Sequence, residues 1–246
     1  MSGRTNVPTD PADYAHTQWH GLEQTLGNRS SNAVVDRLAE RIPTLCDASG
    51  ALPSQERLAK ALGVSRALLR EALSQLVARG VVLVRAKAGS RVVDERMWQL
   101  VDRHVVGWRL ARATDPAFAA DIAGIRRVLE PTAAADAARH ASPQQRARIT
   151  VASATRLAAR TLLEYASARR ELHVALLAAS PNQFLQQLTC LVPPVDPDLD
   201  PRAVAPEILE GERRAVVLLD TAIRNADAGV AREAIERLNG FDLPRV

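Results

Sequence analysis

Three polar residues at the start of one predicted helix have side chains suited to contacting nucleic acid. Ser65 is positioned to cap the helix, and Arg66 and Arg70 follow it four residues apart. Both guanidiniums therefore lie on one face, away from the apolar stripe that begins at Leu69. Arginine binds phosphate and the O6/N7 edge of guanine, and a helix start favours an anion. The alternative for each arginine is a solvated surface charge.

The elements around these residues are predicted from apolar spacing and turn signals. Ser54 precedes one helix as a cap and Gly63 follows it as a stop, while Gly80 ends the helix that carries Arg66. Two β-branched runs then flank a basic segment that contains glycine. The predicted elements are helices from Ser31 to Leu45, Ser54 to Leu62 and Ser65 to Gly80, strands over 81–84 and 91–93, and a hairpin tip over 85–90. This order is that of a winged helix-turn-helix.

The charge distribution points to the same segment. The chain of 246 residues has a net charge of +4, and residues 31–96 hold 11 Lys and Arg against 7 Asp and Glu. The excess of positive charge therefore lies where a polyanion would bind, although so small an excess also arises by chance.

Composition excludes several classes of protein. Hydrophobic residues make up 47% and aromatic residues 3% of the chain, which favours a mostly helical fold over disorder or an all-β fold. No apolar run reaches a membrane-spanning length and the start lacks a signal-peptide pattern, so we expect a cytoplasmic protein without membrane partners. Cys46 and Cys190 are interpreted as reduced thiols.

The rest of the chain predicts a helical bundle. Residues 1–30 have no sustained period and are interpreted as a flexible tail, and residues 31–96 form the winged helix-turn-helix. Residues 97–246 are predicted to be an all-helical domain that binds an effector and dimerises. Its further helices are expected over about 143–159, 161–180, 182–192, 204–226 and 228–239, with a proline-rich connector over 192–198. A long helix before these is expected to begin at a cap formed by Asp115 and Pro116.

The segment LPSQERLAKALGVSRALLREALSQLVARGVVLVRAKAGSRVV resembles the DNA-binding domain of GntR-family transcriptional regulators. The family commonly has arginine, a phosphate contact, where this chain has Glu56, so the contact either moves to Arg57 or is lost. The resemblance implies a homodimer on an inverted repeat in double-stranded DNA. The candidate DNA-binding residues are Ser54, Arg57, Ser65, Arg66, Arg70, Lys87, Gly89 and Arg91.

The segments IRRVLEPTAAADAARHAS, ELHVALLAASPNQFLQQL and ERRAVVLLDTAIRNADAGVAREAIERL resemble the all-helical effector domain (FCD-like) of the FadR-type branch of that family. The segments WQLVDRHVVGWRLA and IRRVLEP are similar to its sugar-acid-responsive members. Most such domains hold a metal through one Asp and three His. Here only His173 matches, and the other positions are Arg169, Arg213 and Leu238. The resemblance with these departures implies that the domain holds no metal and no cofactor.

The replaced ligands leave two interpretations of this region. Arg169 and Arg213 could project into one cavity and supply the positive charge for a carboxylate effector, with Arg126 and His173 beside them. Alternatively, His173 is an ordinary core histidine and Arg126 pairs with Glu130, four residues later on the same helix.

Two functions therefore stay open, and a third is disfavoured. The first is a dimeric regulator, a repressor, that senses a small acidic metabolite. The second is a DNA-binding repressor that acts constitutively or answers to a protein because its ligand site has decayed. An enzyme is disfavoured because the sequence lacks GxSxG, HExxH and a glycine-rich phosphate loop, and its five His are scattered.

Overall fold

The computed structural model describes residues 31–85, 89–111, 116–192 and 206–240, and these residues form two compact units. Described residues up to 111 belong to the first unit, and those from Pro116 onward belong to the second. Within the described ranges, no helix has the length and apolarity required to cross a membrane. The predicted tail over 1–30, the Asp115 cap, Lys87 and most of the proline-rich connector lie outside the described residues.

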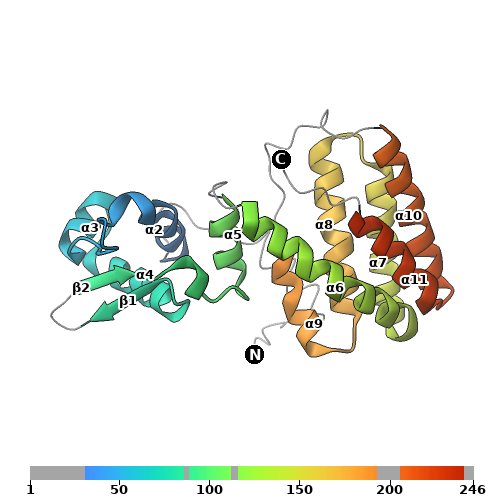
Figure 1. The fold of residues 1–246 in the computed structure, drawn as a ribbon, viewed down its shortest axis with the longest axis horizontal. Helices are drawn as coiled ribbons and strands as arrows, with labels where there is room; N and C mark the ends of the chain where they lie inside the picture. Colours follow the sequence, from blue (N-terminus) through green and yellow to red (C-terminus); the bar gives the residue numbers. More distant parts are fainter. Residues whose placement is uncertain (1–30, 86–88, 112–115, 193–205, 241–246) are drawn as a thin grey trace, which may run out of the picture. The chain divides into compact units, whose positions relative to one another are not determined.

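The first unit is built on three helices that share one apolar core (Figure 1). These helices are α2 (Ser31–Leu45), α3 (Gln55–Leu62) and α4 (Arg66–Ala78), close to the expected bounds. Leu38, Leu58 and Leu69 are each at most 1% exposed, which fixes the helices against one another through burial of apolar surface.

The turn between α3 and α4 has the backbone geometry that the sequence predicts. Ser54 Oγ accepts from the amide of Arg57, and Ser65 Oγ accepts from the amide of Leu68, so each serine caps its helix. Gly63 has φ +65°, a left-handed conformation that disfavours any residue with a Cβ atom. This turn sets the direction in which α4 leaves α3, and so the face that α4 presents.

The wing is an antiparallel pair, β1 (Val82–Arg85) and β2 (Gly89–Val92), with Val82 opposite Val92 and Arg85 opposite Gly89. The two strands therefore reach nearer the tip than the expected runs at 81–84 and 91–93. Residues 50–52 pair with the other edge of β2, since the amide of Leu52 donates to Ser90 O and that of Val92 to Gly50 O. Both edges of β2 are thus hydrogen-bonded within the unit.

The first unit extends past the boundary at residue 97 that the sequence suggested. The 3₁₀ turn η1 (Glu95–Met97) and helix α5 (Arg103–Ala111) follow the wing. Trp98, Val105 and Trp108 are buried in the same core as α2 and α4, and α5 packs on α2. Apolar burial therefore assigns α5 to the first unit rather than to the second.

The second unit is all-helical, as expected. Helices α7, α8, α10 and α11 run side by side, and α6 packs against α8, α10 and α11 (Figure 1). Their core is lined by alanine and leucine, with Leu172, Leu176, Leu219 and Ile235 each 0% exposed. The described elements are α6 (Pro116–His140), α7 (Pro143–Ala158), α8 (Leu162–Ala179), α9 (Gln183–Gln187), the 3₁₀ turn η2 (Leu188–Leu191), α10 (Pro206–Arg224) and α11 (Ala228–Gly240).

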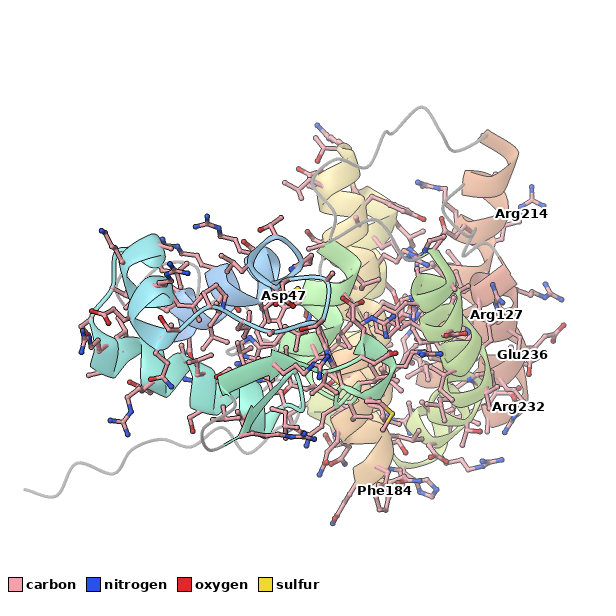
Figure 2. All side chains as sticks on the ribbon, turned by 60° about the vertical axis from the view of Figure 1, so that its left-hand side comes forward. Asp47, Arg127, Phe184, Arg214, Arg232 and Glu236 are labelled. Carbon is pink, nitrogen blue, oxygen red and sulfur yellow. The ribbon has the colours of Figure 1, made fainter. Side chains whose placement is uncertain are left out.

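The outer faces of this bundle carry solvated charges. Arg127, Arg214, Arg232 and Glu236 are exposed, and they are among the side chains labelled in Figure 2. Charged groups on the surface are ordinary. Those that lie inside the bundle require an explanation.

Candidate nucleic-acid interface and effector site

The start of α4 presents its two arginines to solvent. Arg66 and Arg70 are exposed, while Leu69 between them is 0% exposed. The arrangement follows from helical spacing, since residues four apart return to within about 40° of each other while consecutive residues such as Leu69 and Arg70 are about 100° apart. The Ser65 cap fixes the first turn, so both side chains start from an ordered backbone.

Glu56, at the start of α3, is bonded to the first of these arginines. Arg66 Nη2 donates to Glu56 Oε1 at 2.7 Å, and the two side chains are 70% and 74% exposed. Arg57, the alternative site for a phosphate contact, is also exposed. The sequence identified Glu56 as a departure, but not that it would reach an arginine ten residues away on another helix.

The wing residues take different positions. Gly89 has φ +81° at the start of β2 and is exposed. Arg91 is exposed as well, but its Nε donates to Ser49 O at 2.7 Å and its Nη2 bonds the same carbonyl. Arg91 therefore joins the wing to the turn at 47–50, so part of its hydrogen-bonding capacity is used within the unit.

The second unit buries a carboxylate at its centre. Glu130 of α6 is 0% exposed; Arg126 Nε donates to its Oε1 at 2.8 Å, and His173 Nδ1 lies 3.0 Å from its Oε2. The structure thus brings Arg126 and His173 together, and the pairing of Arg126 with Glu130, one of the two sequence interpretations, is observed. His173 Nε2 has no hydrogen-bond partner among the described residues.

The surroundings set the charge of this group. Burial would raise the pKa of Glu130, but His173 and Arg126 outweigh it and lower that pKa to about 2. Burial lowers the pKa of His173 to about 3, against the attraction of Glu130. At neutral pH the histidine is therefore neutral and Nδ1–H donates to the charged carboxylate, which leaves Nε2 as a hydrogen-bond acceptor.

A second buried ion pair, which the sequence did not indicate, joins α7 to α10. Arg156 Nη2 bonds Glu212, and Tyr165 of α8 donates its hydroxyl to the same carboxylate. Nε and Nη1 of Arg156 have no partner among the described residues. Burial lowers the pKa of Arg156 and raises that of Glu212, so both charges are held at a desolvation cost. The signal in the sequence was an arginine on the apolar face of α7, seven residues after Ile149.

Arg169 lies in this charged region and Arg213 does not. Burial, followed by the nearby Arg126 and Arg156, lowers the pKa of Arg169 to about 9. Arg213 is instead exposed, and its Nη1 donates to Leu157 O at 3.0 Å. The expectation that Arg213 projects into one cavity with Arg169 is therefore wrong for this structure. On α10 the buried position is Glu212, one residue earlier, and the second inward arginine is Arg156.

The remaining predicted ligand position is apolar. Leu238 is 1% exposed in the core of the bundle. Among the described residues, no group of three or more His, Cys, Asp and Glu could hold a metal ion. What the geometry offers in place of a metal is a set of guanidiniums around two carboxylates and one neutral imidazole, which suits an anion with a hydroxyl group.

Comparisons with known proteins match both units. Residues 30–92 match the family model of the bacterial regulatory proteins of the gntR family, and residues 121–238 match the FCD domain. The chain is 27% identical over 190 residues to the galactonate operon transcriptional repressor of Escherichia coli K12, covering 74% of this chain and 81% of that protein.

Two further relatives agree. An E. coli K12 protein named for the regulation of the L-lactate dehydrogenase operon is 33% identical over 159 residues, which are 62% of this chain and 60% of that protein. The solved structure of Lar, which controls the expression of the Listeria monocytogenes agr system, is 19% identical, with a TM-score of 0.54, over 88% of this chain and 95% of that one. The latter likeness concerns the fold alone. With a gntR-type reading unit followed by an FCD domain, this chain belongs to the GntR family of transcriptional regulators.

Proposed function

We propose that the protein is a repressor that binds operator DNA through α4 and the wing and releases it when a small hydroxy acid occupies the second unit. The proposal that the second unit binds an effector rests on the buried cluster. In this cluster Arg156 Nε and Nη1 and His173 Nε2 lack hydrogen-bond partners among the described residues. Buried polar atoms in native proteins nearly always have a hydrogen-bond partner, so each of these atoms marks a place where a further molecule could bond.

The chemistry of the three atoms specifies the ligand. The guanidinium donates to a carboxylate, and neutral Nε2 accepts from a hydroxyl group. Arg169 adds positive charge within range of Arg156. The names of two relatives concern operons for galactonate and L-lactate dehydrogenase, and both galactonate and lactate are hydroxy acids.

Thermal unfolding with defined acids tests the effector half. Galactonate and L-lactate should raise the melting temperature, propionate should raise it less because it lacks the hydroxyl, and lactamide should have no effect. A ligand at 100 times its Kd adds about 2.7 kcal/mol to the stability of the native state. If no acid shifts the transition and operator binding is constitutive, the second function, a repressor with a decayed ligand site, replaces this one.

The DNA half of the proposal includes a homodimer on an inverted repeat, acting in the cytoplasm where operators lie. One small reading unit buries too little surface for nanomolar affinity, so two are needed. Arg66→Ala and Arg70→Ala should each weaken operator binding by about 1 to 3 kcal/mol and lower its salt dependence. Arg232→Ala, an exposed arginine of the second unit, is the matched control. Unchanged affinity in the double variant, or a monomer at micromolar concentration in gel filtration, would contradict this half.

A further inference from the structure

The bond between Glu56 and Arg66 places a negative charge on the surface that is proposed to read DNA. Arg66 is the first residue of α4, and its Nη2 lies 2.7 Å from Glu56 Oε1. Lys60, four residues after Glu56 on α3, is a possible partner that is nearer in sequence and on the same helix. The carboxylate is instead directed to the arginine of the neighbouring helix.

This pair has little to contribute to stability. The two side chains are 70% and 74% exposed, and ion pairs at such sites contribute little to folding because solvent screens them and side-chain entropy opposes them. The role of the Glu56–Arg66 pair therefore lies in binding at this surface rather than in stabilising the fold.

A carboxylate next to a groove-reading arginine has two effects on DNA. It repels phosphate, so it subtracts from the affinity for any sequence. It also accepts a hydrogen bond from the N4 amino group of cytosine, while the arginine donates to guanine O6 and N7. An Arg–Glu pair thus presents donors and an acceptor together, which matches the major-groove edge of a G·C pair or of adjacent G and C bases.

We propose that Glu56 is a specificity-determining residue of the DNA-reading surface: paired with Arg66, it selects a G·C-containing step and lowers the affinity for unrelated DNA. This inference rests on the proposed reading role of Arg66. It assigns Glu56 to discrimination between sequences, a role separate from anchoring the protein on the backbone.

Two substitutions of Glu56 separate these effects. Glu56→Ala removes both the repulsion and the acceptor, so affinity for random duplex DNA should rise about tenfold and the preference at the base pairs facing Arg66 should weaken by a similar factor. Glu56→Gln removes the charge but places an amide there, which pairs with the N6/N7 edge of adenine, so the preferred base should shift from cytosine toward adenine.

The experiment is a selection from a random duplex library with the full-length wild-type chain, both Glu56 variants and the control Glu233→Gln. Glu233 forms an exposed i,i+4 pair with Arg237 on α11, so it tests the loss of one surface carboxylate outside the reading unit. The control should return the wild-type motif.

The outcomes separate this inference from the proposed function. A wild-type motif that is lost or changed in the Glu56 variants supports the inference. The same motif and the same ratio of specific to random binding in all four proteins would overturn it while leaving DNA binding in place. A wild-type chain that selects no motif would refute the proposed function, and this inference with it.

Discussion

Glu130 and His173 show how one buried residue fixes the charge of its neighbour. The carboxylate is charged because Arg126 and His173 bond it, and the imidazole is neutral because burial opposes a further positive charge near Arg126 and Arg169. The two pKa shifts change the stability of the folded state in different ranges of pH: the shift of Glu130 stabilises it, and the shift of His173 destabilises it as the pH falls. Glu130 stabilises the folded state above its unfolded pKa near 4.5, and this contribution is lost as the pH falls from there toward 2.

His173 affects the stability of the folded state over a higher range of pH than Glu130 does. Its folded pKa of about 3 lies below its unfolded value of 6.5, so only the unfolded chain takes up the proton between these values. Lowering the pH from 7 to 5 should therefore cost about 2 kcal/mol of stability through this residue. In His173→Asn that component should disappear, while the exposed His140→Asn should behave as wild type. Denaturant unfolding at both pH values measures it, and equal pH dependence in all three proteins would show that His173 is not buried in neutral form.

On helix α10, the face on which a side chain lies determines whether that side chain is buried or exposed. Glu212 is buried in the bundle and bonds Arg156 of α7 and Tyr165 of α8, whereas Glu210 is exposed and bonds Arg214. The two glutamates are separated by two positions, and their environments are opposite. Arg213, one position after Glu212, is exposed for the same reason, because consecutive residues lie about 100° apart on the helix.

The two glutamates form a matched pair for mutation. Glu212→Gln leaves Arg156 buried without its anion, so it should destabilise the protein by about 3 to 5 kcal/mol. Glu210→Gln removes only an exposed i,i+4 pair and should change stability by less than about 0.5 kcal/mol. Denaturant midpoints of the two variants provide the comparison. Similar small losses would mean that Arg156 reaches solvent or another anion when Glu212 is neutral.

Contacts between residues close in sequence could be predicted from the sequence, whereas contacts between separate helices could not. Ser54, Gly63 and Ser65 act within a few residues of their own position, so the helix bounds and the turn of the first unit were predictable. Arg156 and Glu212 stand 56 residues apart, and their meeting depends on how α7 and α10 are rotated in the bundle. The Glu56–Arg66 bond spans ten residues but crosses a turn, and spacing along one helix could not predict it.

Amide hydrogen exchange can test whether α5 belongs to the first unit. Trp108 of α5 donates from Nε1 to Asp36 of α2 at 2.8 Å, and Arg79 lies over its ring. Trp108→Phe removes the donor, so amide hydrogen exchange in α2 and α5 should become faster. Helices α10 and α11 should keep their protection, because they belong to the other unit. Exchange that accelerates in α10 and α11 but not in α2 would place α5 with the second domain, as the sequence had suggested.

The whole molecule should need no metal for its fold or its regulation. The ligand positions implied by the family resemblance hold Arg169, Arg213 and Leu238, and the charge near Arg169 repels a cation. Elemental analysis of the purified protein should find well under one equivalent of zinc, nickel or manganese, and chelators should leave its melting temperature unchanged. A stoichiometric metal that is lost in His173→Asn would contradict this prediction.

The backbone bonds on both edges of β2 have a consequence for the energetics of DNA binding. A strand held by β1 on one side and by residues 50–52 on the other is already ordered, so this part of the wing has no folding left to complete at the operator. Binding that is coupled to folding shows a large negative heat capacity change, equivalent to burying about 1,000 to 3,000 Å². Calorimetry over a range of temperatures should therefore give no heat capacity change from folding of β1 and β2, so that these strands meet DNA as a preformed surface.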